Sequence, residues 1–407
     1  MMLHRLPQPA QGARRSRGFS LIELMVSLVI GMGLIITMGV LSQKFETSKR
    51  EQSTSSDLSG TSAFLSYDLD RQIRSAGSGF TNGYEDTFAC ALNVSKSNAQ
   101  ILPAPVALPD PFGSVPQAIT LVPLAVYPAT GSTDSDTIQI MTATGGVGEV
   151  STQLKYKSVN TNQLQLVSNV GIEANDLLLI TEKGRPCMIE QVKGLNATTP
   201  DIIDLDGAYY ASVINGQALN DRGTSASVNA KAFNIGNASN GNPPMFHLLG
   251  VNGSNQLVRY DLMRFNNGGS GGNQPIPITD GVMMMRTLYG VDTSGDGKVD
   301  SWVRPGTGSF TAANVTTNSA IARQIVAIKI AMVLRSDTIE DQSSNAKTTA
   351  TRSTFFVAPE KLTLFTSQAT TLRTDYEVTD RQRRHLVVEF TVPLRNQLAS
   401  LRTTTPD

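Results

Sequence analysis

Residues 19–41 read FSLIELMVSLVIGMGLIITMGVL, with one charged residue, Glu23, among 23 positions. As an α-helix that rises 1.5 Å per residue, this run is roughly 34 Å long, enough for a hydrocarbon core of about 30 Å. The 18 residues before it contain four arginines and no acidic residue. The pattern predicts a membrane-spanning helix that follows a short basic leader.

The charges on either side of this helix predict its orientation. Arginines precede it, whereas the charges of residues 44–51 nearly cancel, so residues 1–18 are expected to lie in the cytoplasm and the rest of the chain to be exported. A secretory signal has a shorter apolar run that ends in a small-residue cleavage site. Because no such site follows Leu41, we expect the anchor to be retained.

Glu23 is unusual because an ionised carboxylate inside an apolar span costs on the order of 2.5–3.5 kcal/mol on insertion scales. The sequence around it, RGFSLIEL at residues 17–24, resembles the processing motif of type IV pilins and pseudopilins. The resemblance implies cleavage between Gly18 and Phe19 by the prepilin peptidase, N-methylation of Phe19, and pairing of Glu23 with the amino terminus of a neighbouring subunit during assembly. The alternative is an ordinary one-span anchor with a chance glutamate.

Beyond the membrane the helix is expected to continue. Apolar residues recur at helical spacing at Leu58, Leu65, Leu69 and Ile73. Asp70 and Arg74 can form an i,i+4 ion pair, and Gly77-Ser78-Gly79 then interrupts the pattern. We therefore expect one helix over residues 19–76, with residues 19–41 in the membrane.

After residue 80 the sequence changes to short apolar runs separated by Pro, Gly, Asn and Asp, which is typical of β-rich structure with long loops. The expected strands are Thr137–Met141, Leu177–Thr181, Met245–Leu249, Leu257–Leu262, Val282–Tyr289, Ile325–Leu334 and Leu386–Leu394. The turn sequence at 251–255 predicts a hairpin. The expected fold is α+β: a helical spine that carries a β-sheet-rich globular head, with a variable region at 77–280 and a carboxyl-terminal region at 281–407.

The carboxyl-terminal region contains LYGVDTSGDGKVD at 288–300, IVAIKIAMVLRS at 325–336 and RRHLVVEFTVPLRN at 383–396. These segments resemble the PilW-like minor pilins of the type IV pilus. The resemblance implies a structural subunit that supports pilus biogenesis, by initiation, tip formation or minor incorporation, and through it twitching motility or adhesion. Its partners would be other pilins, contacted through the amino-terminal helix, the prepilin peptidase and the assembly machinery. It would lie in the inner membrane with a periplasmic head, and then in the pilus at the cell surface.

Two other functions stay open. A pseudopilin of a type II secretion system shares the amino-terminal signature. A tip adhesin or ligand-binding module would use the middle of the chain, residues 81–240, where the resemblance is loose. An enzyme has no support, because no GxSxG, HExxH, P-loop or GxGxxG motif is present in the sequence.

The segment 292–300, DTSGDGKVD, has the spacing of a calcium-binding loop. The side chains of Asp292, Ser294, Asp296 and Asp300 occupy positions 1, 3, 5 and 9, and Lys298 offers a backbone carbonyl at position 7. Val303 stands at position 12, where an EF-hand has glutamate, and a strand rather than a helix is expected before the loop. The alternative is a turn rich in Asp and Gly that forms without metal.

Cysteine and charge complete the expectations. Cys90 and Cys187 lack metal-site spacing, so a disulfide is favoured over two free thiols if the head lies outside the cytoplasm.

Lys+Arg and Asp+Glu are balanced at 34 each, and removal of residues 1–18 would leave 30 basic against 34 acidic residues. No specific nucleic-acid binding is predicted, since no overall basic field exists; the arginines at 381, 383 and 384 are interpreted as a solvated strand entrance.

Overall fold

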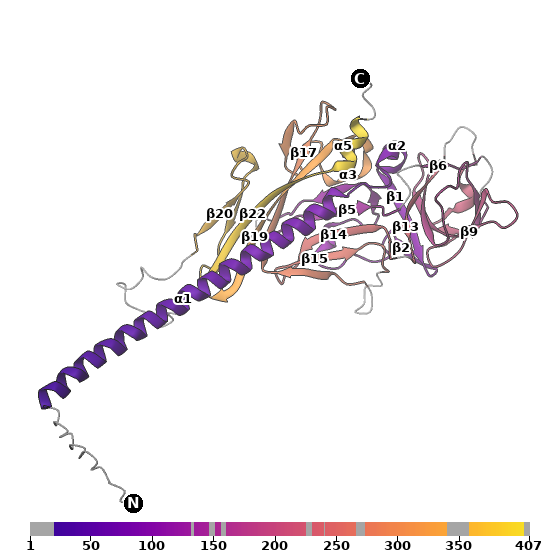
Figure 1. Ribbon diagram of the computed structural model, residues 1–407. Coiled ribbons are helices and arrows are strands. Elements are labelled where there is room, and N and C mark those ends of the chain that lie inside the picture. Colours follow the sequence, from indigo (N-terminus) through magenta and orange to yellow (C-terminus); the bar gives the residue numbers. More distant parts are fainter. Residues whose placement is uncertain are drawn as a thin grey trace, which may run out of the picture. The chain divides into compact units, whose positions relative to one another are not determined.

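The computed structural model describes residues 20–131, 134–145, 151–155, 160–224, 230–239, 241–265, 273–339 and 358–402. These residues form a long amino-terminal helix and a sheet-rich globular part, so the predicted α+β class is confirmed (Figure 1). By its internal contacts the chain divides into two units, residues 1–56 and 57–407.

Helix α1, Leu21–Arg74, crosses the boundary between the two units. In the first unit, Leu21–Gln43 is long and apolar enough to span a membrane. In the second unit the remaining turns bury one apolar stripe, as the helical spacing predicted, at Leu58, Leu65, Leu69 and Ile73. Each fully buried residue of this stripe stabilises the head by about 1.5–3 kcal/mol. Arg74 Nε donates to Asp70 Oδ2 at 3.0 Å, which confirms the expected i,i+4 pair.

The helix ends at Arg74, two residues before the expected end, because the chain turns sharply at Gly77. Gly77 has a φ of +81°, a left-handed conformation that side chains disfavour. A Cβ atom at this position would also lie only 2.3 Å from Oγ1 of Thr81. Glycine is therefore required here.

A residue near the carboxyl terminus closes the end of α1. Asn396 Nδ2 donates to the carbonyl oxygens of Ser75 at 3.1 Å and Ala76 at 2.9 Å. These two carbonyls lie in the turn directly after α1, where Ser75 O also accepts from the amide of Ser78 at 3.1 Å. Asn396 lies in helix α5, Arg395–Arg402.

Within the described residues, the largest sheet has nine strands, of which six form the path β2-β1-β9-β8-β13-β6. Its strands are β1 (Cys90–Lys96), β2 (Ala99–Leu102), β3 (Thr120–Leu121), β6 (Thr152–Gln153), β7 (Gln163–Gln165), β8 (Asp176–Thr181), β9 (Cys187–Leu195), β10 (Ile202–Leu205) and β13 (Lys231–Asn237). Leu177 and Leu179 of β8 enter one apolar cluster, whereas Leu178 and Ile180 enter another. Both faces of this sheet are therefore covered.

The second sheet has the order β16-β15-β14-β5-β4. Its strands are β4 (Leu124–Tyr127), β5 (Thr137–Thr142), β14 (Met245–Val251), β15 (Gln256–Asp261) and β16 (Ile276–Asp280). The predicted hairpin is confirmed, since β14 and β15 pair antiparallel and Val251 opposes Leu257. Asn255 takes the left-handed conformation, with a φ of +58°, that the turn requires.

The third sheet has the order β18-β17-β19-β22. Its strands are β17 (Val282–Val291), β18 (Ser301–Val303), β19 (Ile325–Ile339) and β22 (Arg383–Pro393). Met285 and Tyr289 face the main core, whereas Met284 and Leu288 face a smaller cluster. This cluster is covered by the paired strands β20 (Lys361–Leu364) and β21 (Thr374–Glu377). Like the first sheet, this one is buried on both faces.

Short elements complete the described part of the chain. They are α2 (Tyr84–Thr87), α3 (Ala312–Thr317), α4 (Ser319–Arg323), the 3₁₀ turns η1 (Thr81–Gly83), η2 (Phe112–Ser114), η3 (Leu219–Asp221) and η5 (Thr370–Leu372), and the paired strands β11 (Val213–Ile214), β12 (Gln217–Ala218), β20 (Lys361–Leu364) and β21 (Thr374–Glu377). All seven expected strands are present. β19 runs five residues beyond its expected end at Leu334, because a register shift lets Ile339 pair with Arg383 of β22.

The predicted disulfide between Cys90 and Cys187 is present, and the two Cα atoms lie 5.7 Å apart. It joins β1 and β9, which pair in parallel with Leu92 opposite Cys187. The bond closes a loop of 97 residues. It therefore fixes a contact that the chain would otherwise have to find over a long separation.

Replacing both cysteines by alanine should lower the free energy of unfolding by about 4–5 kcal/mol, the chain-entropy value for a loop of this length. Guanidinium unfolding of the full chain in detergent, followed by Trp302 fluorescence, measures the loss. Reduction of the wild type should reproduce it and should leave the double variant unchanged. A loss below about 1 kcal/mol would contradict this role of the disulfide.

Candidate functional site

The first candidate site is the apolar surface of α1 in the first unit. Every large apolar side chain from Leu21 to Leu41 is more than half exposed in the single chain, between 51% and 78%. The surface is apolar on all sides of the helix, as in a segment that is surrounded by lipid or by other helices. Added Cβ atoms at Gly31, Gly33 and Gly39 would meet nothing within 4 Å. These glycines leave shallow places where another helix can approach closely.

The hydroxyl groups of this segment are satisfied inside the helix itself. Ser27 Oγ donates to the carbonyl of Leu24 at 2.9 Å, and Thr37 Oγ1 donates to the carbonyls of Gly33 and Leu34 at 3.0 and 2.9 Å. Transfer of these hydroxyl groups into a nonpolar environment therefore has only a small free-energy cost, because they are already hydrogen-bonded. Among the polar side chains of the span, Glu23 is the one that needs a partner from outside the helix.

Glu23 lies exposed in the first turn of α1. The free backbone N–H groups and the dipole at the start of a helix favour a carboxylate there. The carboxylate therefore lies at the amino-terminal end of α1, close to where cleavage before Phe19 would create a new amino terminus. Gly18 and Phe19, the predicted cleavage and methylation positions, lie outside the described residues, so processing stays a prediction.

The second candidate site is the loop between β17 and β18, which contains the expected calcium ligands. Asp292 directly follows β17 and is buried, and Asp300 directly precedes β18. One carboxylate oxygen each from Asp292, Asp296 and Asp300 lies within 4.8 Å of the others. The loop thus brings together three acidic residues that the sequence spacing singled out.

Hydrogen bonds hold the outer two carboxylates in place. Asp292 accepts from the amide of Gly295 at 2.6 Å and from that of Gly297 at 2.7 Å. Asp300 Oδ2 accepts from the amide and the hydroxyl of Thr293, both at 2.8 Å. Thr293, at loop position 2, was not among the predicted residues; its hydroxyl next to Asp292 is the signal that could have indicated it.

The two exposed carboxylates are ionised at neutral pH. The Lys298 backbone amide and then its ammonium group lower the pKa of Asp296 below its usual value. The Thr293 hydroxyl, followed by the Thr293 and Ser294 amides, lowers the pKa of Asp300. Lys298 Nζ also lies 3.1 Å from Asp296 Oδ2, but both side chains are largely exposed, so this pair is weak.

This loop fits a calcium ion in part. Two oxygens that bind one Ca²⁺ at about 2.3–2.6 Å lie at most about 5 Å apart, which the three carboxylates satisfy. Ser294 Oγ lies 3.2 Å from Asp292 Oδ1 and so belongs to the same oxygen cluster. As expected, a strand precedes the loop, and Val303 at position 12 pairs with Tyr289 in the sheet instead of offering a carboxylate.

Comparison with known proteins gives two matches. Residues 232–396 match the family model of the type IV pilus-assembly protein W, and residues 13–41 match that of the prokaryotic N-terminal methylation motif. No curated protein and no solved structure matched the chain. The two matched segments cover both candidate sites, the apolar helix and the acidic loop.

Proposed function

We propose that this chain, a PilW-like type IV pilin that takes part in pilus assembly, is a minor structural subunit of the pilus and helps to initiate or cap the filament. The observation that carries the proposal is the apolar, exposed surface of α1 between Leu21 and Leu41, with one carboxylate, that of Glu23, in the first turn. Such a surface must be shielded from water. Lipid would shield it before assembly, and neighbouring pilin helices would shield it afterwards.

Glu23 gives this assembly its register. Cleavage before Phe19 would create a positively charged amino terminus a few residues from the carboxylate. A buried carboxylate is tolerated when a cation is buried with it, whereas an unpartnered one costs several kcal/mol. A neighbouring subunit that places its amino terminus against Glu23 would satisfy both charges at once. Helices offset from this position would leave both charges unpaired.

The size of the chain supports a minor role. A subunit of 407 residues carries a large head, which is difficult to repeat thousands of times along a thin filament. A bulky head fits best where few copies are needed, at the tip or at scattered positions. The predicted route is an inner-membrane precursor with its head in the periplasm, followed by a place in the pilus at the cell surface.

Glu23→Ala should lower the amount of this subunit in sheared pili by at least about tenfold, because the partner's amino terminus would be buried without a counter-ion. Immunoblots of pili and membranes measure the ratio. Glu46→Ala, an exposed position of the same helix, is the matched control. Intact-mass analysis should show a chain that begins at methylated Phe19 in both variants. Equal entry of Glu23→Ala and wild type into pili would refute the role of Glu23.

Deletion of the gene should remove surface pili and twitching while the secretion of exoproteins continues. Electron microscopy of cells and enzyme assays of the culture medium measure the two effects, and a plasmid copy should restore pili. The opposite pattern, normal pili with blocked secretion, would show a pseudopilin of a type II secretion system instead.

We also propose that the loop at 292–300 binds Ca²⁺ through the side chains of Asp292, Ser294, Asp296 and Asp300 and the carbonyl of Lys298. The mutual distances of at most 4.8 Å among the three carboxylates support this proposal. A bound divalent cation would offset their like charges and fix the connection between β17 and β18. Without a carboxylate at position 12, the site would be weaker than an EF-hand.

Calcium at 10 mM should raise the melting temperature of the full chain in detergent by about 2 °C, as expected for a site with a dissociation constant of about 1 mM. Asp296→Ala should abolish this rise, and Mg²⁺ at the same concentration should not reproduce it. Asp292 is unsuitable for the test, because its carboxylate also accepts two loop amides. An unchanged melting temperature of the wild type would exclude the site.

A further inference from the structure

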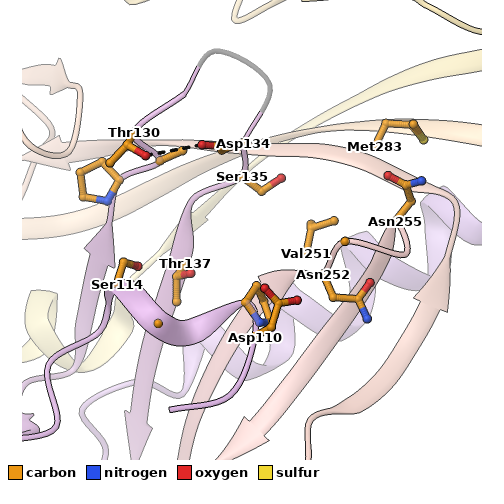
Figure 2. Close-up of a pocket in the computed structure, with 15 residues that line it drawn as sticks. Asp110, Ser114, Thr130, Asp134, Ser135, Thr137, Val251, Asn252, Asn255 and Met283 are labelled. Carbon is orange, nitrogen blue, oxygen red and sulfur yellow. Dashed lines mark hydrogen bonds between the residues drawn. The ribbon is translucent and has the colours of Figure 1, made fainter. Parts of the chain in front are cut away.

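A polar pocket of about 490 Å³ lies in the second unit, where three loops meet. Its walls come from residues 110–114, from 128–130 together with 134–137, and from 251–255, and Met283 contributes from the start of β17. In Figure 2, Asp134 and Ser135 border the pocket on one side and Asp110 and Asn252 on the other. Its volume lies within the range of about 300–1,000 Å³ that is typical of small-molecule sites.

The wall made by residues 128–130 and 134–137 is fixed by a buried carboxylate, that of Asp136. Its Oδ1 accepts from the amide of Ala129 at 3.0 Å and from Arg286 Nη1 at 3.3 Å. Its Oδ2 accepts from the amide of Thr287 at 2.8 Å and from the Thr287 hydroxyl at 2.9 Å. Because β17 supplies three of these four donors, this wall is attached to the third sheet.

The other two walls are equally well supported. In the hairpin turn, Asn252 Oδ1 accepts from the amides of Ser254 and Gln256, each at 3.0 Å. In the wall at 110–114, the buried ring of Phe112 packs against Tyr260, with 5.7 Å between the ring centroids. All three walls are therefore formed before any ligand arrives, which lowers the entropic cost of binding.

The lining determines what can enter. Asp110 and Asp134 carry negative charge, and no cationic side chain is among the described residues that line the pocket. Asp134 Oδ2 accepts from the amide of Gly131 at 2.9 Å, whereas the carboxylate of Asp110 has no hydrogen-bond partner in the described part of the chain. Anionic ligands such as phosphates, nucleic acids and acidic sugars would be repelled.

The remaining groups both donate and accept hydrogen bonds. Hydroxyl and amide groups come from Ser114, Thr130, Ser135, Thr137, Asn252 and Asn255. Ser135 Oγ already accepts from the amide of Met285 at 3.0 Å, so its proton is available to a ligand. Pro111, Pro128, Val251 and Met283 add apolar surface between these groups. A sugar ring has this same combination of hydroxyl groups around its edge and apolar C–H faces.

We propose that this pocket binds a sugar of one or two rings that carries no negative charge, and that it prefers an amino sugar, whose ammonium group would pair with the pocket carboxylates. Two of the walls, 110–114 and the one made by 128–130 and 134–137, lie outside the segment that matches the pilus-assembly family. The pocket thus combines residues from outside that segment with residues 251–255 and Met283, which lie inside it. Contact between the head and a glycan at the cell surface is an expectation that rests on the pilus role proposed above.

The test is ligand binding by the full mature chain in a zwitterionic detergent without a sugar headgroup. Saturation-transfer NMR and calorimetry at pH 7 would compare glucosamine, glucose, glucuronate and cyclohexylamine. Glucosamine should bind with a millimolar dissociation constant, about threefold tighter than glucose because of one exposed charge pair. Glucuronate should bind at least about tenfold more weakly than glucosamine. Cyclohexylamine, which has the charge but no hydroxyl groups, should also bind at least about tenfold more weakly.

Variants locate the site. A Cβ atom at Gly113 or Gly253 would meet nothing within 4 Å, and neither glycine needs a left-handed backbone. Gly113→Leu and Gly253→Leu should therefore fold normally and obstruct the pocket, while Gly60→Leu, at an equally open glycine of α1, should bind like wild type. Asp110→Asn should reduce the preference for glucosamine over glucose, and Asp337→Asn, an exposed acid outside the pocket, should not.

Four outcomes would overturn the proposal. They are absence of binding by both glucosamine and glucose at about 50 mM, glucuronate binding as tight as that of glucosamine, cyclohexylamine binding as tight as that of glucosamine, and unchanged sugar binding in folded Gly113→Leu and Gly253→Leu variants. Melting temperatures of the leucine variants show whether they are folded, and Asp110→Asn tests the site independently of any obstruction.

Discussion

The apolar surface of α1 between Leu21 and Leu41 is the constraint on which the rest of the protein depends. Its large side chains are all more than half exposed in the single chain, and each would gain about 1.5–3 kcal/mol from complete burial. Water cannot be the permanent surrounding of such a helix. Lipid and neighbouring helices can both cover it, but only a neighbouring helix can bring a fixed cation to Glu23. In the proposed assembly, pairing of this carboxylate with a neighbour's amino terminus would distinguish the assembled state from the membrane-inserted one.

The same helix also belongs to the core of the head. Leu65, Leu69 and Ile73 are completely buried in the second unit, so the carboxyl-terminal part of α1 cannot be separated from the sheets without opening the core. The first and third sheets are covered on both faces. Such a sheet holds its loops at fixed positions, and the acidic loop between β17 and β18 is held in this way. In the polar pocket, residues 251–255 connect β14 and β15 of the second sheet, and Asp136 attaches the neighbouring wall to β17 of the third sheet.

Local patterns in the sequence predicted most of the elements. Three features were predicted from patterns among residues close in sequence. They are the apolar run at 19–41, the helical spacing of the stripe that ends at Ile73, and the turn sequence around Asn255. The disulfide followed from the cysteine count and the expected compartment. Helices α3 and α4 were missed although their N-caps are visible in the sequence: Thr311 accepts from the amide of Asn314, and Asn318 from that of Ala320.

The order of the strands could not be predicted, because β1 pairs with β9 and β5 with β14 across long stretches of chain. Spacing alone predicted the three acidic residues of the loop at 292–300. The polar pocket had no such signal, since its walls come from three separate segments and its key support, Asp136, looks like an ordinary loop residue until Thr287 is placed beside it. Calcium binding and processing at Phe19 stay predictions.

The contact of Asn396 with Ser75 and Ala76 has a consequence for how the protein is made. The acceptors are synthesised first, and their donor follows 320 or 321 residues later. At about 5–20 residues per second, the ribosome needs roughly 15–60 s to reach it. During that interval the end of α1 has only the local hydrogen bonds of its turn, from the amide of Ala76 to Ile73 O and from that of Ser78 to Ser75 O. A chain that ends before Asn396 would lack this donor for the carbonyl groups of Ser75 and Ala76 and would also lose most of α5.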